Sequence, residues 1–190
     1  MLIVRNSRFA VSMIFAINGA LFGTWASRIP AISNIHDLSP ASLGLLIFLM
    51  GLSAVVAFSI FGRAADRYGA AFVTKLASSI FLPLTLIFIA YANSIWMLIA
   101  AIIFFGGIHG GIDVAMNAWA AEVERKHERP LMSSFHAMWS LGSGIGAGSG
   151  VLLATYNLGV KTHFTISSVV IFLLAPGSYT HLTLPTNPSV

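Results

Sequence analysis

Three polar side chains recur at intervals of four residues within a predominantly apolar part of this sequence: His109, Asp113 and Asn117. In a helix this spacing places all three on one face. Asp113 is the sole acidic residue in the apolar spans, and burying a charge in apolar surroundings is costly unless it has a partner. A carboxylate beside an imidazole suits proton transfer or the binding of a polar solute, because His titrates near neutral pH.

A second imidazole, His136, lies near the start of a later apolar run, roughly 8 Å along a helix from its first residue. We therefore expect His109, Asp113 and His136 at one height on adjacent helices, as a proton relay or a solute-binding group. One alternative is that Asp113 has only a structural role between packed helices, with its carboxylate paired with His136, Asn117 or a backbone group. Another is a zinc site, for which the sequence offers no fourth ligand, so we predict no metal and no cofactor.

Two further polar residues could contact a solute. Asn18 lies about 14 Å along a helix from Phe9, near the middle of the first apolar run. Its amide can bind a hydroxyl group or join two helices. Ser140 follows His136 by four residues and shares its face. The rings of Trp25 and Trp139 could stack on a sugar, although Trp25, near the end of its run, is expected at a membrane interface.

The composition indicates the elements that must hold these residues. Charged residues make up 8% of the 190 residues and hydrophobic residues 57%, whereas about a quarter of a soluble domain is charged. The uncharged stretches are residues 9–27, 38–62, 76–112 and 130–160. Since a membrane-spanning helix needs about 20 apolar residues, these stretches predict an all-α, polytopic membrane bundle. The absence of cysteine excludes disulfides and thiolate catalysis.

Helix-breaking and charged residues divide the chain into six predicted helices, at residues 9–27, 41–61, 72–92, 95–120, 131–154 and 163–175. The basic residues are scattered singly between them, which indicates membrane topology rather than nucleic-acid binding. With a cytoplasmic amino terminus, eight basic residues lie inside: Arg5, Arg8, Arg63, Arg67, Lys75, Arg125, Lys126 and Arg129. Only Arg28 and Lys161 lie outside, so we expect this orientation in a bacterial inner membrane.

The segment between the second and third predicted helices carries a spaced motif: Gly62, Asp66, Arg67 and Gly69. It resembles the cytoplasmic signature loop of the major facilitator superfamily, in which Gly and three residues precede Asp-Arg, one residue and Gly. The two glycines are expected to permit a tight turn, and Asp66 to cap or face the third helix. The resemblance implies a conformational latch. The sequence departs from the family at residues 70–71, where alanines replace the usual basic residues.

The resemblance covers roughly residues 9–160, including 106–117 and 129–136, which look similar to sugar-permease-like and uncharacterised inner-membrane branches. Members of this family have twelve helices in two halves, with the solute between them and alternating access by rocking. The resemblance therefore implies that this chain is the amino-terminal six-helix half and that its partner is a missing carboxy-terminal half. The antiporter branches carry a Gly-Pro motif on the fifth helix, and residues 131–160 contain no proline.

Small residues recur along the fifth predicted helix. Glycines at 142, 146 and 150 form one face, glycines at 144 and 148 a second, and the first helix carries the pair Gly19 and Gly23. Such faces allow helices to approach closely. We expect them to serve packing.

The sixth predicted helix is short. Residues 163–175 would span about 20 Å against a hydrocarbon core of about 30 Å. Either the helix starts earlier, near Leu158, with Lys161 reaching the interface, or the native sequence stops near Ala175 and residues 176–190 are foreign or disordered. The abrupt change of composition favours the second explanation. The predicted domain is therefore residues 1–175, with the sixth helix incomplete.

Three functions remain open. The leading hypothesis is a proton-coupled symporter of a small polar solute, such as a sugar or metabolite, with Asp113 as the coupling residue and no enzymatic activity. The second is an intramembrane metal-dependent enzyme that uses His109, Asp113 and His136. The third is a non-transporting scaffold subunit, for which the glycine faces would be dimer surfaces.

Overall fold

The computed structural model describes residues 2–177, and this range contains helices and no strand. In chain order the segments are α1 (Leu2–Ser27), α2 (Ile29–Ile35), α3 (Pro40–Tyr68), α4 (Ala70–Leu76), the π-helical turn η1 (Ala77–Phe81), α5 (Leu82–Ala90), α6 (Ile95–His127), α7 (Met132–Thr155) and α8 (Val160–Gly177). The predicted all-α class is confirmed. The tail predicted to be foreign or disordered lies, from residue 178 onward, outside the described residues, so that prediction stays untested.

Five helical stretches of the described part are long and apolar enough to cross a membrane. They are Ser7–Ser27, Pro40–Tyr68, Ala70–Ala90, Ile95–His127 and Met132–Thr155. Val160–Ala175 is apolar but shorter. The length and apolar composition of these helices confirm the multi-pass prediction.

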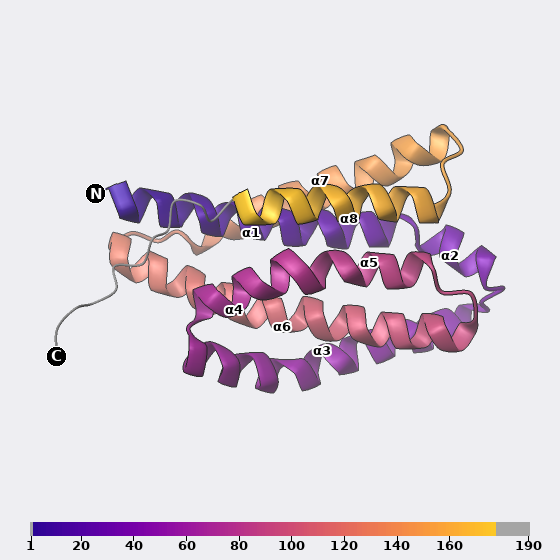
Figure 1. Cartoon of the computed structure of the whole chain (residues 1–190), viewed down its shortest axis with the longest axis horizontal. Helices are drawn as coiled ribbons and strands as arrows, with labels where there is room; N and C mark the ends of the chain where they lie inside the picture. The colour runs from indigo at the N-terminus through magenta and orange to yellow at the C-terminus, as the bar shows by residue number, and fades with distance from the viewer. Residues whose placement is uncertain (1, 178–190) are drawn as a thin grey trace.

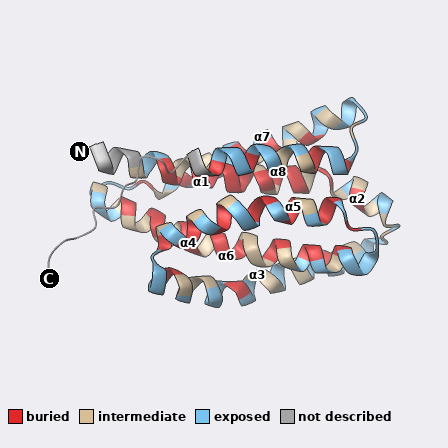
Figure 2. Ribbon diagram, in the orientation of Figure 1, coloured by how far each residue is buried: buried red, intermediate tan, exposed pale blue. Residues whose placement is uncertain are grey.

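The helices lie side by side along the long axis of the molecule (Figure 1). The most extensive packing joins α1 with α7 and α3 with α6, while α5 contacts both α6 and α8. Buried residues gather where α1, α5 and α6 face their neighbours, and the outer sides of α3, α7 and α8 are exposed (Figure 2). We call the end that holds Tyr68 and residues 128–131 the basic end. The opposite end holds α2 and residues 91–94 and 156–159.

Glycines set the distance between α1 and α7. A Cβ atom added at Gly142 or Gly146 would collide with the backbone carbonyls of Ala16 or Ala20 on α1. Gly19 of α1 is equally close to the backbone of α7. By contrast, a Cβ at Gly144 or Gly148 would meet nothing within 4 Å. One predicted glycine face therefore packs inside the bundle and the other is open.

Several predicted boundaries were wrong. The second helix was expected to end at residue 61, but α3 continues to Tyr68, because residues 62–67 remain helical and the chain turns only at Gly69 (φ 90°). Residues 29–35, which lie between the first two predicted helices, form α2, with Pro30 in its first turn, where the missing N–H costs nothing. The fourth helix was expected to end at residue 120. It runs to His127 and stops at Glu128, whose φ of 52° is left-handed.

The third and sixth predicted helices also differ from expectation. The third, expected at 72–92, spans Ala70–Ala90 and contains η1 just before Pro83. Proline lacks the N–H that would continue the ladder, and a π turn is one way for a helix to absorb that defect. The sixth begins at Val160 rather than 163. Lys161 is accommodated in its first turn, since its ammonium lies 5.6 Å from the centre of the Tyr91 ring.

Candidate functional site

Of the three polar residues predicted on one face of α6, two are joined by hydrogen bonds: Asp113 and Asn117. The Asn117 side-chain amide donates to the backbone carbonyl of Asp113 at 2.8 Å and to its carboxylate Oδ1 at 3.2 Å. Both side chains are half-buried. Asn117 therefore orients the carboxylate of Asp113 from one turn further along the same helix.

His109, one turn before Asp113, lies among aromatic rings. Its imidazole is 5.2 Å from the Phe22 ring of α1 and is stacked on Phe105 at 5.6 Å with an interplanar angle of 29°. The Nε2 atom of His109 is buried and has no hydrogen-bond partner among the described residues. Because buried polar atoms in proteins are almost always hydrogen-bonded, this unpartnered nitrogen makes His109 a candidate binding residue.

Asn18 is fully buried and lies next to the same region. The indole Nε1 of Trp139 on α7 donates to its side-chain Oδ1 at 2.9 Å. Its Nδ2 atom is a second buried polar atom with no partner in the described part of the chain. Trp139 also contacts the Phe22 ring at 5.7 Å, so α1, α6 and α7 meet here. An unpaired amide donor and an unpaired imidazole nitrogen can together hold a hydroxylated group.

His136 and Ser140 lie on α7 and are exposed. The edge of the His136 ring packs against Phe15 at 5.3 Å, and His136 is near enough to Asp113 for their charges to interact. Ser140 donates its hydroxyl to the backbone carbonyl of His136 at 3.1 Å, which satisfies it on its own helix. The structure thus brings Asn18, His109 and the Asp113–Asn117 pair toward one region and leaves Ser140 at its edge.

One expectation about a side chain is corrected, and the zinc alternative finds no support. Trp25 was expected at a membrane interface, but it is 5% exposed and packs on Phe105 and Phe22. The reason is that α1 is central to the bundle. Within residues 2–177, no group of three or more His, Asp or Glu side chains is arranged to hold a metal ion, so the geometry does not support a zinc site at His109, Asp113 and His136.

The latch motif has a different local structure from the one expected. Gly62 lies inside α3, and only Gly69 has the positive φ that a turn requires. Asp66 is exposed in the last turn of α3, and no side chain caps α4. The expected capping by Asp66 is therefore wrong. The Arg67 guanidinium lies 5.2 Å from the centre of the Tyr68 ring.

A second polar cluster, at the opposite end, was missed by the sequence reasoning. Arg28 is 6% exposed and His163 is fully buried, and they are hydrogen-bonded to each other and, through His163, to Ser149. Burial lowers the pKa of the Arg28 guanidinium from its ordinary value. The available signal was that Arg28 directly follows an apolar run and precedes Pro30.

Comparisons with known proteins agree with the helical architecture. A family model described as Major Facilitator Superfamily matches residues 9–189. The chain is 43% identical over 157 residues to the uncharacterized transporter y4wD of Sinorhizobium fredii, which covers 83% of this chain and 41% of that protein. It is 32% identical over 172 residues to an uncharacterized MFS-type transporter of Yersinia pestis, covering 90% of this chain and 44% of the relative.

A third relative is the membrane protein MosC of Rhizobium meliloti, 28% identical over 177 residues, with 91% of this chain and 42% of the relative covered. No solved structure matches the chain. The chain spans about two fifths of the length of these curated relatives.

Proposed function

The chain belongs to the Major Facilitator Superfamily, and on this basis we propose that it is the amino-terminal half of a secondary active transporter. The transporter moves a small polar solute, such as a sugar or related metabolite, together with protons by alternating access. It lies in a bacterial inner membrane with its basic end in the cytoplasm, as the distribution of Arg and Lys indicates.

The observation that carries the solute site is that two buried atoms, Asn18 Nδ2 and His109 Nε2, have no hydrogen-bond partner among the described residues. They belong to different helices, α1 and α6, and aromatic rings border both residues. An amide that donates, a ring nitrogen and flat apolar faces are the groups that recognise a hydroxylated ring. In this proposal Trp139 fixes the orientation of Asn18, and Ser140 borders the site.

Asp113 is the proposed proton-coupling residue. It is held by Asn117 on its own helix and lies within electrostatic range of His136 on α7. A carboxylate that gains and loses a proton changes its attraction to His136, and such a change can bias one helix against another. Asp66 and Arg67 are proposed to form the latch that controls opening at the basic end.

The missing carboxy-terminal half is proposed to pack on the open sides of α3 and α7. A Cβ atom added at Gly51 of α3, or at Gly144 or Gly148 of α7, would meet nothing within 4 Å, and exposed apolar side chains such as Ile145 lie beside these glycines. A surface of this kind suits close helix approach in a membrane. No observation on the described residues specifically favours the two alternatives, an intramembrane metal-dependent enzyme and a non-transporting scaffold subunit.

The test uses the full-length transporter in proteoliposomes that contain a pH-sensitive dye and are supplied with a panel of monosaccharides and sugar alcohols. We expect at least one solute to drive proton entry. Asp113→Asn should abolish that entry while leaving expression intact, and Glu128→Gln, which removes an exposed acid at the end of the same helix, should not. Proton entry in Asp113→Asn at the normal rate would remove Asp113 from the coupling site.

A further inference from the structure

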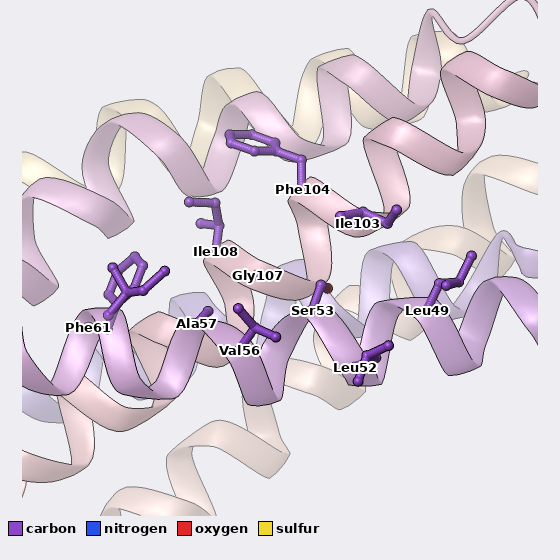
Figure 3. Close-up of a pocket in the computed structure, with 11 residues that line it drawn as sticks. Leu49, Leu52, Ser53, Val56, Ala57, Phe61, Ile103, Phe104, Gly107 and Ile108 are labelled. Carbon is purple, nitrogen blue, oxygen red and sulfur yellow. The ribbon is translucent and has the colours of Figure 1, made fainter.

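An apolar groove of about 490 Å³ runs between α3 and α6 (Figure 3). Its walls include Leu52, Val56 and Ile60 from α3 and Ile103, Phe104 and Gly107 from α6. The single hydroxyl in its wall, on Ser53, donates to the backbone carbonyl of Met50 at 2.7 Å, so this donor needs no hydrogen bond from a bound molecule. The groove can therefore hold only an apolar group.

The groove continues along α3 toward the basic end. A second apolar hollow, of about 290 Å³, shares Ile60 and Phe61 with the first and ends at Tyr68. From Leu49 to Tyr68 the path follows 19 residues of α3, which is about 28 Å at 1.5 Å per residue. This length is close to the thickness of a bilayer hydrocarbon core, about 30 Å.

Aromatic residues mark both ends of this face. Trp96, 77% exposed, precedes Ile103 by seven residues and therefore lies on the same side of α6, near the opposite end of the bundle. Tyr68, 59% exposed, lies at the basic end. Exposed Trp and Tyr are enriched where a membrane protein meets the lipid headgroups. This pattern indicates that the groove faces lipid rather than another part of the transporter.

Positive charge lies at the Tyr68 mouth of the groove. Arg67 is stacked on the Tyr68 ring, and Arg63 is exposed one turn earlier on α3. Asp66 is exposed between them in the sequence, so this end of α3 carries two positive charges and one negative charge. An exposed arginine with a free side of its fork binds phosphate well.

We propose that this groove is a binding site for one anionic membrane phospholipid. One acyl chain lies between α3 and α6, and the headgroup phosphate contacts Arg67 at the Tyr68 mouth. This lipid site does not depend on the proposed solute or on Asp113.

The first test follows the lipid directly. This chain contains no cysteine, so in a cysteine-free full-length protein Val56→Cys can be labelled with a fluorescent bimane. Val169→Cys on α8 is the control, because Val169 is also apolar and is 52% exposed outside the groove. In vesicles of phosphatidylcholine with increasing amounts of brominated phosphatidylglycerol, quenching at residue 56 should saturate at a low mole fraction. At residue 169 it should rise in proportion to that fraction.

Equal, proportional quenching at both positions would mean that only bulk lipid reaches the groove. No quenching at residue 56 would mean that another part of the protein fills it. Either result would overturn the proposal.

The second test fills the groove. A Cβ atom at Gly107 would have its nearest neighbour, the carbonyl oxygen of Ser53, at 3.9 Å, so Gly107→Leu fits the helix contact and projects into the space. Val169→Phe on α8, which adds bulk at an exposed position outside the groove, is the control. Native mass spectrometry should show phosphatidylglycerol occupancy about tenfold lower in Gly107→Leu and unchanged in Val169→Phe.

Unchanged occupancy in Gly107→Leu would contradict the acyl-chain site, and if that variant does not fold, the labelling experiment at residue 56 decides. Arg67→Gln should remove the preference for phosphatidylglycerol over phosphatidylcholine while quenching at residue 56 persists. Retained preference would contradict the headgroup contact.

Discussion

Arg28 Nε donates a hydrogen bond to His163 Nδ1 at 2.9 Å, across 135 positions of sequence. A guanidinium group cannot accept, so Nδ1 of His163 carries no proton and the neutral ring is protonated at Nε2. That Nε2 lies 3.0 Å from Oγ of Ser149, whose hydroxyl donates onward to the carbonyl of Gly146 at 2.6 Å. The chain of bonds fixes α7 and α8 to the junction of α1 and α2.

Removing His163 should destabilise the bundle. In His163→Leu the buried Arg28 loses the acceptor for its Nε, and an unpaired buried donor of this kind costs on the order of 1–3 kcal/mol. We expect a lower Tm for the purified full-length protein, followed by tryptophan fluorescence on heating. His36→Leu, which removes a partly exposed histidine beside α2 at the same end of the bundle, should change the Tm little.

The double variant Arg28→Leu with His163→Leu provides the control for coupling. Replacing both partners by apolar groups removes the unpaired donor, so it should recover part of the lost Tm. If the effects of the two substitutions simply add, the hydrogen bond between them contributes nothing measurable.

The latch motif should depend on one of its glycines only. Gly69 has φ 90° and ψ 132°, a backbone conformation that costs other residues about 1–3 kcal/mol. Gly69→Ala should therefore reduce stability, and, if the turn acts as a latch, transport as well. Gly62→Ala should be neutral or slightly stabilising, because Gly62 is helical and its nearest neighbour is Val114 Cγ1 at 4.0 Å. A comparison of Tm and uptake in the two variants checks this.

The two glycine faces of α7 should respond differently to the same substitution. Gly146→Ala places a methyl group on the backbone carbonyl of Ala20, which cannot move without shifting α1. We expect loss of the monodisperse peak in size-exclusion chromatography. Gly148→Ala leaves the contact between α1 and α7 untouched, because its Cβ atom would meet nothing within 4 Å in this half, so it should disturb elution less than Gly146→Ala does. Normal elution of Gly146→Ala would show that α1 and α7 are less tightly packed than the structure indicates.

The local features of the candidate site could be predicted. The pairing of Asp113 with Asn117 follows from their spacing of four residues on one helix, because helical geometry alone places such residues together. The hydrogen bond between Asn18 and Trp139 joins residues 121 positions apart. Its prediction needs the register of α1 against α7, which depends on how the glycines of both helices interlock.

The boundaries of the helices were predictable only where composition changes. The start of α6 follows Ser94, whose side chain accepts from the backbone N–H of Met97 at 3.3 Å, and it was placed correctly. The end of α3 was missed by seven residues, because the charged segment 62–68 remains helical until Gly69. Charge within a sequence marks the edge of the membrane, whereas a helix ends where the backbone dihedral angles change.

The sequence by itself determined the membrane location, the long spans and the family, because these depend on the amount and order of apolar residues and on one spaced motif. The tertiary structure alone decided which polar atoms share a site. It left Asn18 Nδ2 and His109 Nε2 without partners among the described residues, paired Arg28 with His163, and opened the groove between α3 and α6. The physical reason is that the length of an apolar run specifies which helices enter a bilayer, whereas the partner and register of each helix depend on how side-chain shapes on two helices fit together.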